Sequence, residues 1–256
     1  MNRPEIIEII FQHGWGQTSK PFQLWQTILL EQINLSKLNV DLRCRFLDRP
    51  YFNQDSSTGL QTRECHENRK IIVVTHSLGL HLIDSTQLLR ADLLLCLSGF
   101  VNWHRHSPIG ESLSKRVLER MLNKLKVKPE QVLKDFYERC GQAQEHRPSL
   151  SELDPGLLYQ DLLLLQDAEL GAARSILKLT SRALVLQGKD DALISVGQTE
   201  ELADHLGTAF CELVPNCSHD LPNQMAERGC ALIMEFLKED GLPPDSSARK
   251  SACIGL

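Results

Sequence analysis

The chain has 256 residues, 42% of them hydrophobic and 24% charged, with a formal net charge of −5 at pH 7. This size suits one domain with a substantial core, and the acidic balance argues against nucleic acid, because phosphate binding needs a basic surface. No apolar run reaches the about eighteen residues that a membrane span requires, and the opening residues lack a signal-peptide pattern. We therefore expect a cytoplasmic protein that does not enter membranes.

Short apolar runs alternate with longer amphipathic ones along the chain. Strands are predicted over residues 6–11, 40–47, 71–74, 93–97, 183–186 and 210–214. Helices are predicted over residues 22–35, 78–89, 196–206 and 223–238, where apolar side chains recur every three or four positions. This alternation predicts the α/β class, with a mostly parallel central sheet flanked by helices.

Strand patterns disappear over residues 100–180, where helix-like, charge-rich sequence takes over. A structureless loop of this length is uncommon inside a compact domain, and strand patterns resume after it. We interpret it as a helical lid inserted into a core of residues 1–99 and 181–240. Residues 241–256 have no apolar periodicity and are expected to form a flexible tail.

The predicted strand over residues 71–74 runs into Thr75-His76-Ser77-Leu78-Gly79. A serine at a sharp turn between a strand and a helix holds its hydroxyl clear of the sheet, as in the nucleophile elbow G-x-S-x-G. Thr75 replaces the first glycine of that motif and is small enough to fit with modest strain. Ser77 is therefore the candidate nucleophile, and the next backbone N–H, that of Leu78, is a candidate oxyanion donor.

A serine nucleophile needs a histidine base and a carboxylate that orients it, in the chain order serine, acid, histidine. Asp190 and Asp191 follow the strand over residues 183–186, and either carboxylate could reach an imidazole from that turn. His219 follows the strand over residues 210–214 and precedes a helix, which makes it the candidate base.

The other histidines receive different interpretations. His13 is expected to hold the loop that it begins, and His76 is expected to form a wall of the pocket. His104 and His106 alternate as metal ligands can, but no further ligand follows at a zinc spacing. We expect neither a metal nor a cofactor.

Four stretches carry a resemblance to a known family: His13-Gly14-Trp15-Gly16, the elbow around Ser77, the Gly188–Ile194 turn and Ser218-His219. Together they resemble the BioH-type pimeloyl-[acyl-carrier-protein] methyl ester esterases of the α/β-hydrolase superfamily, up to about residue 237. The family spacing, in which the acid stands three residues after the glycine, favours Asp191 over Asp190.

The resemblance implies an α/β-hydrolase fold and hydrolysis of the methyl ester of a pimeloyl chain carried by acyl carrier protein, in biotin biosynthesis. It implies that Ser77 is acylated, that His219 transfers the protons and that Asp191 orients the imidazole. The oxyanion donors would be the backbone N–H groups of Trp15 and Leu78. Phe136 resembles a lid aromatic that lines the acyl chain, although ordinary helix packing explains it equally well.

The predicted lid carries six cations and one acid, Glu119, over residues 113–128. Wound as a helix, this segment places Arg116, Arg120 and Lys124 at four-residue steps on a face expected to meet water. Such a face either is simply solvated or docks an acidic carrier protein.

Two other functions remain open from the sequence. The same machinery would serve a broad-specificity carboxylesterase or thioesterase, because it is indifferent to what lies beyond the acyl carbon. A non-catalytic α/β-hydrolase-fold binding protein would keep the pocket and lose turnover.

Overall fold

A computed structural model of the chain describes residues 4–52, 69–167, 170, 182–207 and 209–238. The tail predicted for residues 241–256 and the final part of the predicted lid, residues 171–180, lie outside the described residues. Cys65 and Cys253 also lie outside them, and the six described cysteines are free thiols.

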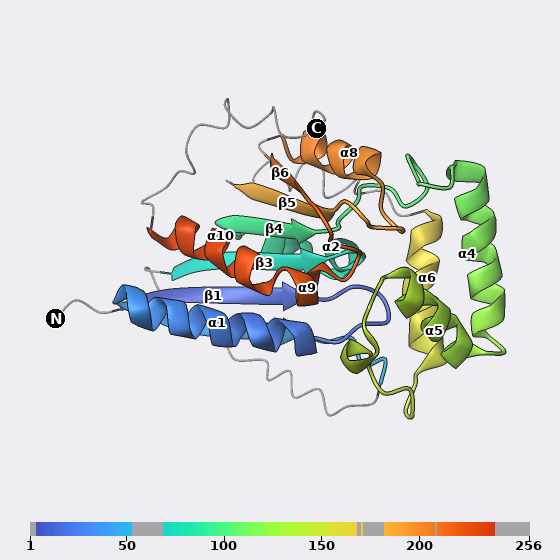
Figure 1. The fold of residues 1–256 in the computed structure, drawn as a ribbon, viewed down its shortest axis with the longest axis horizontal. Helices are drawn as coiled ribbons and strands as arrows, with labels where there is room; N and C mark the ends of the chain where they lie inside the picture. Colours follow the sequence, from blue (N-terminus) through green and yellow to red (C-terminus); the bar gives the residue numbers. More distant parts are fainter. Residues whose placement is uncertain (1–3, 53–68, 168–169, 171–181, 208, 239–256) are drawn as a thin grey trace.

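Six parallel strands form a single sheet with the order β2-β1-β3-β4-β5-β6 (Figure 1). All six predicted strands are present, as β1 (Glu5–Gln12), β2 (Val40–Leu47), β3 (Arg69–His76), β4 (Leu93–Leu97), β5 (Ala183–Gly188) and β6 (Ala209–Val214). Every residue of β4 is buried, as expected for a central parallel strand that is covered on both faces.

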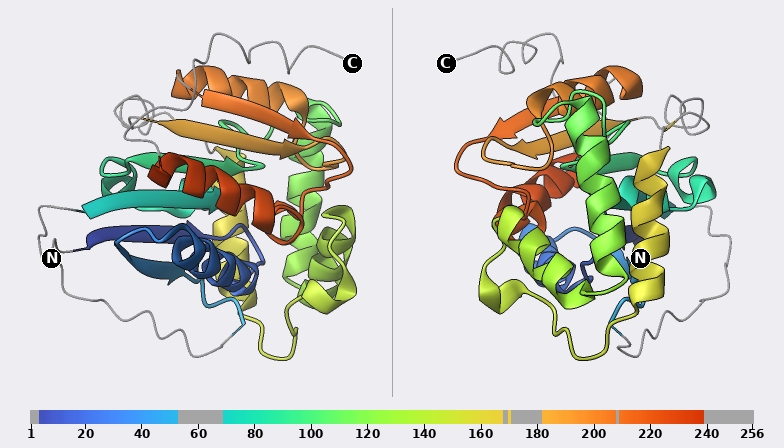
Figure 2. Two further views of the ribbon diagram at one scale, coloured as in Figure 1. Left: turned by 60° about the vertical axis from the view of Figure 1, so that its left-hand side comes forward. Right: turned by 90° about the vertical axis from the view of Figure 1, so that its right-hand side faces the viewer.

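Helices cover both faces of the sheet (Figures 1 and 2). Alternate side chains of β1 show the division: Ile7 and Ile9 belong to one apolar cluster, and Ile10 belongs to the other. The first cluster contains side chains of α1 (Lys20–Ser36) and α10 (Ala226–Lys238), and the second contains side chains of α2 (Gly79–Leu82), α3 (Ser85–Leu88) and α8 (Val196–Leu206). The predicted parallel sheet flanked by helices is confirmed.

The prediction of one helix over residues 78–89 is wrong in one respect, because this segment is divided into two short helices, α2 (Gly79–Leu82) and α3 (Ser85–Leu88). Ile83 takes an extended conformation, with φ −72° and ψ 142°. The carboxylate of Asp84 then accepts a hydrogen bond from the Thr86 N–H at 2.7 Å and caps the second helix. Aspartate favours such caps over helix interiors, which explains the break.

The helix predicted over residues 223–238 also differs from the structure. It begins earlier, as α9 (Leu221–Gln224), and is interrupted before α10 at Met225, where φ is −120° and ψ is 19°. Pro222 lies in the first turn of α9, where a missing N–H costs no intrahelical bond.

The described part of the predicted lid is helical and lies beyond the carboxyl ends of the strands (Figure 1). It contains α4 (Glu111–Leu125), α5 (Pro129–Arg139) and α6 (Pro155–Leu163), with short 3-10 turns at Gln144–His146 and Leu164–Gln166. None of the helices in the described ranges is long and apolar enough to span a bilayer.

An ion pair between the buried Asp161 and the half-buried Arg49 fastens the lid to the core. Asp161 of α6 accepts hydrogen bonds from Arg49 Nε at 2.7 Å and Arg49 Nη2 at 2.5 Å, and a third from the Tyr51 hydroxyl at 2.7 Å. Two parallel N–H donors match the geometry of a carboxylate, so this contact fixes the lid in orientation as well as in position.

Helix α10 packs against Trp25 of α1 at Gly229. A Cβ atom at this position would overlap the ring of Trp25, which is fully buried and donates its Nε1–H to the Pro222 carbonyl at 2.8 Å. The indole is thus fixed from two sides and has little room to move.

We expect Gly229→Ala to lower the free energy of unfolding by about 1–2 kcal/mol. Alanine alone favours a helix by about 1 kcal/mol, but overpacking a dense core costs about 1–3 kcal/mol, and overlap with three atoms of a fixed ring falls in the upper part of that range. Urea unfolding of the wild type and the variant measures the difference. In a Trp25→Phe background, which removes the overlapped ring atoms, the loss should shrink; an equal loss in both backgrounds would contradict this explanation.

Candidate active site

Ser77 stands at the sharp turn between β3 and α2. Its φ is 53°, in the left-handed region that residues with a Cβ rarely adopt, and its N–H donates to the Leu97 carbonyl at 2.9 Å. The turn brings Gly79 against β1, where an added Cβ would lie 2.6 Å from the Gln12 carbonyl oxygen. This is the geometry of a nucleophile elbow, with Thr75 buried in place of the usual glycine.

The structure brings Asp191, and not the exposed Asp190, to the histidine. Asp191 Oδ2 accepts hydrogen bonds from His219 Nδ1 at 2.7 Å and from Ser98 Oγ at 2.9 Å. Its Oδ1 accepts the backbone N–H groups of residues 193 and 194 at 2.8 and 2.9 Å. Asp191, the carboxylate that the family spacing favoured, is therefore the one that contacts His219.

These contacts decide the charge of Asp191 and the orientation of the His219 ring. Burial opposes ionisation of Asp191, but the adjacent His219 ring, its hydrogen bond and two backbone N–H groups outweigh burial and lower the pKa of Asp191 to about 2. An ionised carboxylate can only accept, so Nδ1 of His219 carries the proton.

The opposite ring nitrogen of His219, Nε2, is buried and has no hydrogen-bond partner among the described residues. The bond from Ser77 Oγ to Nε2 is therefore not formed in this structure. Catalytic hydrogen bonds are often long before substrate binds and tighten in the complex. In its neutral form, a ring with its proton on Nδ1 presents a lone pair at Nε2, which is what a general base requires.

The sequence reasoning missed the contacts by which two residues, Ser98 and His76, support this pair. Ser98, with φ 46°, directly follows β4 and donates to Asp191. His76 was predicted to form a wall of the pocket, and that prediction is wrong. Its Nε2 donates to the His219 carbonyl at 2.9 Å, and burial lowers the pKa of His76 to about 3, so the ring is neutral. The only sequence signal for either residue is its position at a strand end.

The loop that follows β1 is held as the sequence predicted. His13 Nδ1 donates to the Gly14 carbonyl at 2.8 Å, and the Arg49 N–H donates to Nε2 at 3.0 Å. Further along this loop, Trp15 Nε1 donates to the Leu158 carbonyl of α6 at 2.8 Å. Hydrogen bonds thus join the loop both to the core and to the lid.

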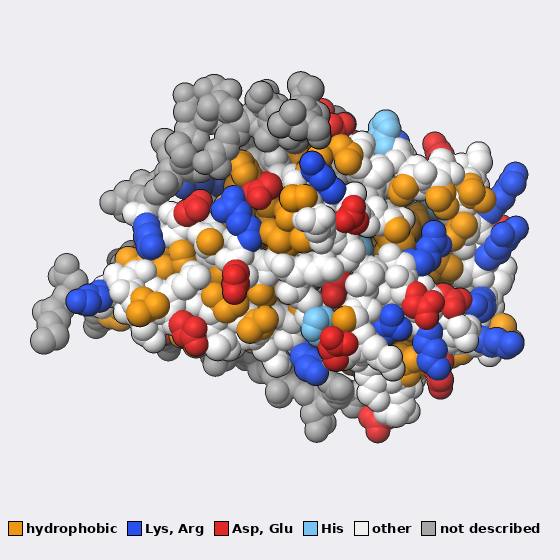
Figure 3. Space-filling model, viewed as in Figure 1, with side chains coloured by type: hydrophobic (Ala, Val, Ile, Leu, Met, Phe, Trp, Pro, Cys, Tyr) orange, Lys and Arg blue, Asp and Glu red, His pale blue; other side chains and the backbone are white. Residues whose placement is uncertain are grey.

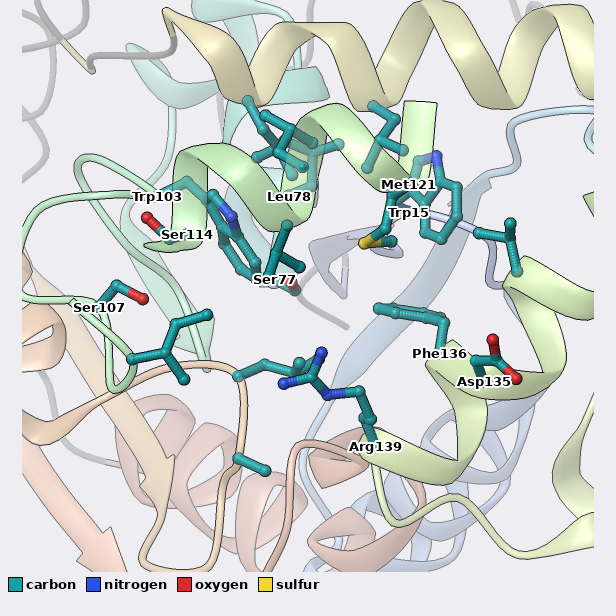
Figure 4. A pocket seen from close by; sticks show the side chains of 18 of the residues that line it. Trp15, Ser77, Leu78, Trp103, Ser107, Ser114, Met121, Asp135, Phe136 and Arg139 are labelled. Carbon is teal, nitrogen blue, oxygen red and sulfur yellow. The ribbon is translucent and has the colours of Figure 1, made fainter. Parts of the chain in front are cut away.

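A cavity of about 180 Å³ lies between Ser77 and the lid (Figure 4). Trp15, Leu78 and Phe136, the residues predicted to bind substrate, all line it. Trp15 meets Phe136 edge to face, with ring centroids 4.9 Å apart. Other apolar walls are Phe100, Trp103, Val117, Leu118, Met121, Val132, Leu162, Leu165 and Leu193. Ser77 is therefore at the floor of a mostly apolar space.

The predicted basic face of the lid is only partly present. Arg116 and Arg120 are exposed on α4, and cationic side chains lie on the part of the surface occupied by the lid (Figure 3). Lys124 also meets water, since 42% of its side chain is exposed, but it lines the cavity and its charge is paired with Asp135 of α5 at 2.6 Å. The packing of α5 beside α4 brings this carboxylate to it.

His104 and His106 serve structural contacts. His104 Nδ1 bonds to the Ser114 hydroxyl near the start of α4 at 2.8 Å, and the His106 carbonyl accepts from the Ser195 hydroxyl that caps α8. Among the described residues, no group of three or more His, Cys, Asp or Glu side chains is placed to hold a metal ion.

Comparisons with known proteins place the fold. No protein-family model and no curated protein matches the chain. Among solved structures, an esterase from Exiguobacterium antarcticum is 14% identical with a TM-score of 0.68, covering 91% of this chain and 92% of its own. A hydrolase from Oleispira antarctica is 15% identical with a TM-score of 0.64, covering 93% of each chain. A bromoperoxidase from Bacillus anthracis is 14% identical with a TM-score of 0.65, covering 92% of each chain.

These similarities show the fold, and their different activities illustrate that one fold hosts several chemistries. The six-stranded parallel sheet, its flanking helices and the helical insertion are those of an α/β-hydrolase fold.

We expect Asp191→Asn to flatten the acid dependence of stability. Because the pKa of Asp191 is lowered from 3.8 to about 2 in the folded chain, its ionised form stabilises the fold above the unfolded pKa, and this contribution is lost as the pH falls towards 2. Between about pH 5 and about pH 3 the wild type should lose about 1 kcal/mol more than the variant. Urea unfolding at both pH values measures this. Equal losses in the two proteins would show that the carboxylate is not held in its charged form.

Proposed function

We propose that the chain is a serine esterase that hydrolyses the methyl ester of a pimeloyl chain carried by acyl carrier protein. The observation that carries the esterase part is the buried Asp191–His219 hydrogen bond of 2.7 Å beside an elbow serine at the floor of an apolar cavity. The substrate part rests on the family resemblance, with the apolar cavity and the exposed lid arginines as support.

The proposed reaction has two halves. In the first, Ser77 Oγ attacks the ester carbonyl carbon while His219 Nε2 takes the serine proton, giving a tetrahedral oxyanion. Collapse of this intermediate breaks the bond to the methoxy group, and His219 donates the proton that releases methanol. In the second half, His219 takes a proton from water, which attacks the carbonyl carbon of the acyl-serine. His219 then returns this proton to Ser77 Oγ as the bond between Oγ and the acyl carbon breaks, which releases the carboxylic acid and restores the serine.

Asp191 acts throughout by holding the ring. Its charge stabilises the imidazolium that forms each time His219 takes a proton, and its hydrogen bond keeps Nε2 directed away from the carboxylate. The backbone N–H groups of Trp15 and Leu78 would stabilise the oxyanion, each by about 3 kcal/mol in the transition state. Leu78 is the N-cap residue of α2, so its N–H has no acceptor within that helix.

The cavity suits an aliphatic acyl group. Aromatic and aliphatic side chains form most of its wall, and pockets of this composition bind ligands by apolar contact, with a few polar groups fixing the orientation. Because α4 and α5 of the lid form part of this wall, substrate would lie between the core and the lid.

Arg116 and Arg120 are the carrier-docking residues that we retain. They are four residues apart on α4 and exposed, as an approaching acidic protein requires. Lys124 is a weaker candidate, since Asp135 already neutralises it.

We expect Ser77→Ala to lower kcat by at least about a thousandfold on methyl pimeloyl carrier protein, because the nucleophile is lost. Ser112→Ala, at an exposed position of α4, is the matched control and should keep full activity. A fluorophosphonate probe should label the wild type and not Ser77→Ala. Absence of labelling in the wild type would favour a non-catalytic binding protein.

We expect the double charge reversal Arg116→Glu, Arg120→Glu to raise KM for carrier-bound substrate by about tenfold and to leave free methyl esters unaffected. Rim charges act mainly by steering encounter with a charged partner, so the effect should diminish at high salt. Steady-state kinetics on both substrates provide the test. Equal turnover of carrier-bound and short p-nitrophenyl esters by the wild type would instead favour a broad carboxylesterase, and preference for thioesters a thioesterase.

A further inference from the structure

Two serines line the cavity in addition to Ser77, and only one of them has a structural contact through its hydroxyl. The Ser114 hydroxyl donates to the Glu111 carbonyl and bonds to His104 Nδ1, both at 2.8 Å. Ser107, by contrast, is hydrogen-bonded only through its backbone among the described residues. In Figure 4 its hydroxyl oxygen points into the cavity, towards the side on which Ser77 lies. The Ser107 hydroxyl is therefore available to a ligand.

Trp103 supplies a second such group from the same loop. The only polar atom of a tryptophan side chain is the indole Nε1, which can donate but not accept, and buried indoles usually find an acceptor. The other two tryptophans do so: Trp15 donates to the Leu158 carbonyl and Trp25 to the Pro222 carbonyl, both at 2.8 Å. Trp103 is half-buried and lines the cavity, but within the described part of the chain its indole N–H has no acceptor.

These two groups make the ends of the cavity different. In the view of Figure 4, Trp103 and Ser107 lie on one side of Ser77, and Trp15 and Phe136 lie on the other. One end thus carries neutral hydrogen-bonding groups, and the other is formed by aromatic rings in edge-to-face contact. In pockets of this kind, a few polar groups fix the orientation of an otherwise apolar ligand.

The end that contains Ser107 also reaches the surface. Pro108 and Ile109, the next two residues, are exposed and line the cavity as well. Helix α4 begins two residues further on and carries Arg116 and Arg120, the proposed docking residues. A chain that leaves the cavity at this end would therefore emerge beside the helix proposed to bind the carrier.

The position of Ser107 is fixed by the backbone of its loop. Its N–H donates to the His104 carbonyl at 3.2 Å, and its carbonyl accepts the Gly110 N–H at 2.9 Å. The Ser195 hydroxyl at the start of α8 donates to the carbonyl of the preceding residue, His106. Because the loop is held by these contacts, the hydroxyl is placed before a ligand arrives, which lowers the entropy that binding costs.

We propose that Ser107 and Trp103 are specificity-determining residues that bind the carbonyl oxygen of the thioester at the far end of the acyl chain. The inference rests on the proposed function. The alcohol part of a methyl ester is a single carbon, so only the acyl part of that substrate can extend to this end of the cavity. Its far end is an uncharged thioester, whose carbonyl oxygen accepts hydrogen bonds. An indole N–H only donates and a hydroxyl can donate, so both groups suit a neutral acceptor.

The test compares two methyl esters that differ in one carbonyl group. The first is the N-acetylcysteamine thioester of monomethyl pimelate, and the second is its thioether analogue, in which a methylene group replaces the thioester carbonyl. In Ser107→Ala, KM for methanol release from the thioester should rise about fivefold with little change in kcat, because the lost hydrogen bond acts in substrate and transition state alike. Both constants for the thioether should stay unchanged.

Two further variants accompany this comparison. Ser112→Ala removes a hydroxyl from an exposed position of α4, outside the cavity, and should change neither constant for either ester. Trp103→Phe removes the indole N–H but keeps an aromatic ring, and should raise KM for the thioester more than KM for the thioether. A selective rise in one of the two cavity variants supports the subsite and identifies the donor. If neither variant raises KM for the thioester more than for the thioether, the proposal is overturned.

A binding measurement separates this inference from the proposed function. Calorimetric Kd values for the two esters are measured in Ser77→Ala, with and without Ser107→Ala and Trp103→Phe, so that no turnover is needed. Tighter binding of the thioester that is lost in either combined variant supports the inference, even if the wild type hydrolyses neither ester. Hydrolysis of both esters by the wild type, with equal KM values that do not depend on Ser107 or Trp103, leaves the esterase function standing and refutes the inference.

Discussion

The buried carboxylate of Asp191 is the constraint on which the rest of the site depends. A charge removed from water is costly unless it is paired and hydrogen-bonded, and here four donors satisfy it. The donors come from the end of β4, from its own turn and from the loop after β6, so one side chain holds three segments together. Because the same contacts fix the tautomer of His219, the stability of this region and the readiness of the base have a common origin.

The sheet could be predicted from the sequence, because buried parallel strands are marked by local apolar runs. Helix ends were less predictable. The division at Asp84 follows a capping contact that a periodicity argument overlooks, and the one at Met225 lies inside a continuous apolar pattern. In both places the apolar spacing of the sequence continues through a residue whose backbone is not helical.

The residues of the candidate site also differ in how far the sequence could predict them. Ser77 and His219 could be predicted because their positions at strand ends are local, and both flank the expected elements. Asp190 and Asp191 could not be separated by turn geometry alone, and only the family spacing favoured Asp191. The roles of His76 and Lys124 depend on which segment packs beside them. For His76 that segment carries His219, far along the chain, and for Lys124 it is the next helix, which carries Asp135.

The loop after β1 is tied to the lid at two points. The Trp15 indole donates to Leu158 of α6, and the Tyr137 hydroxyl of α5 donates to the Gly16 carbonyl at 2.6 Å. A displacement of the lid would therefore pull on the segment that carries the Trp15 N–H, which the proposed mechanism uses as an oxyanion donor. Under that mechanism the peptide would lie beside the serine only while the lid is seated, which would confine the reaction to molecules already enclosed.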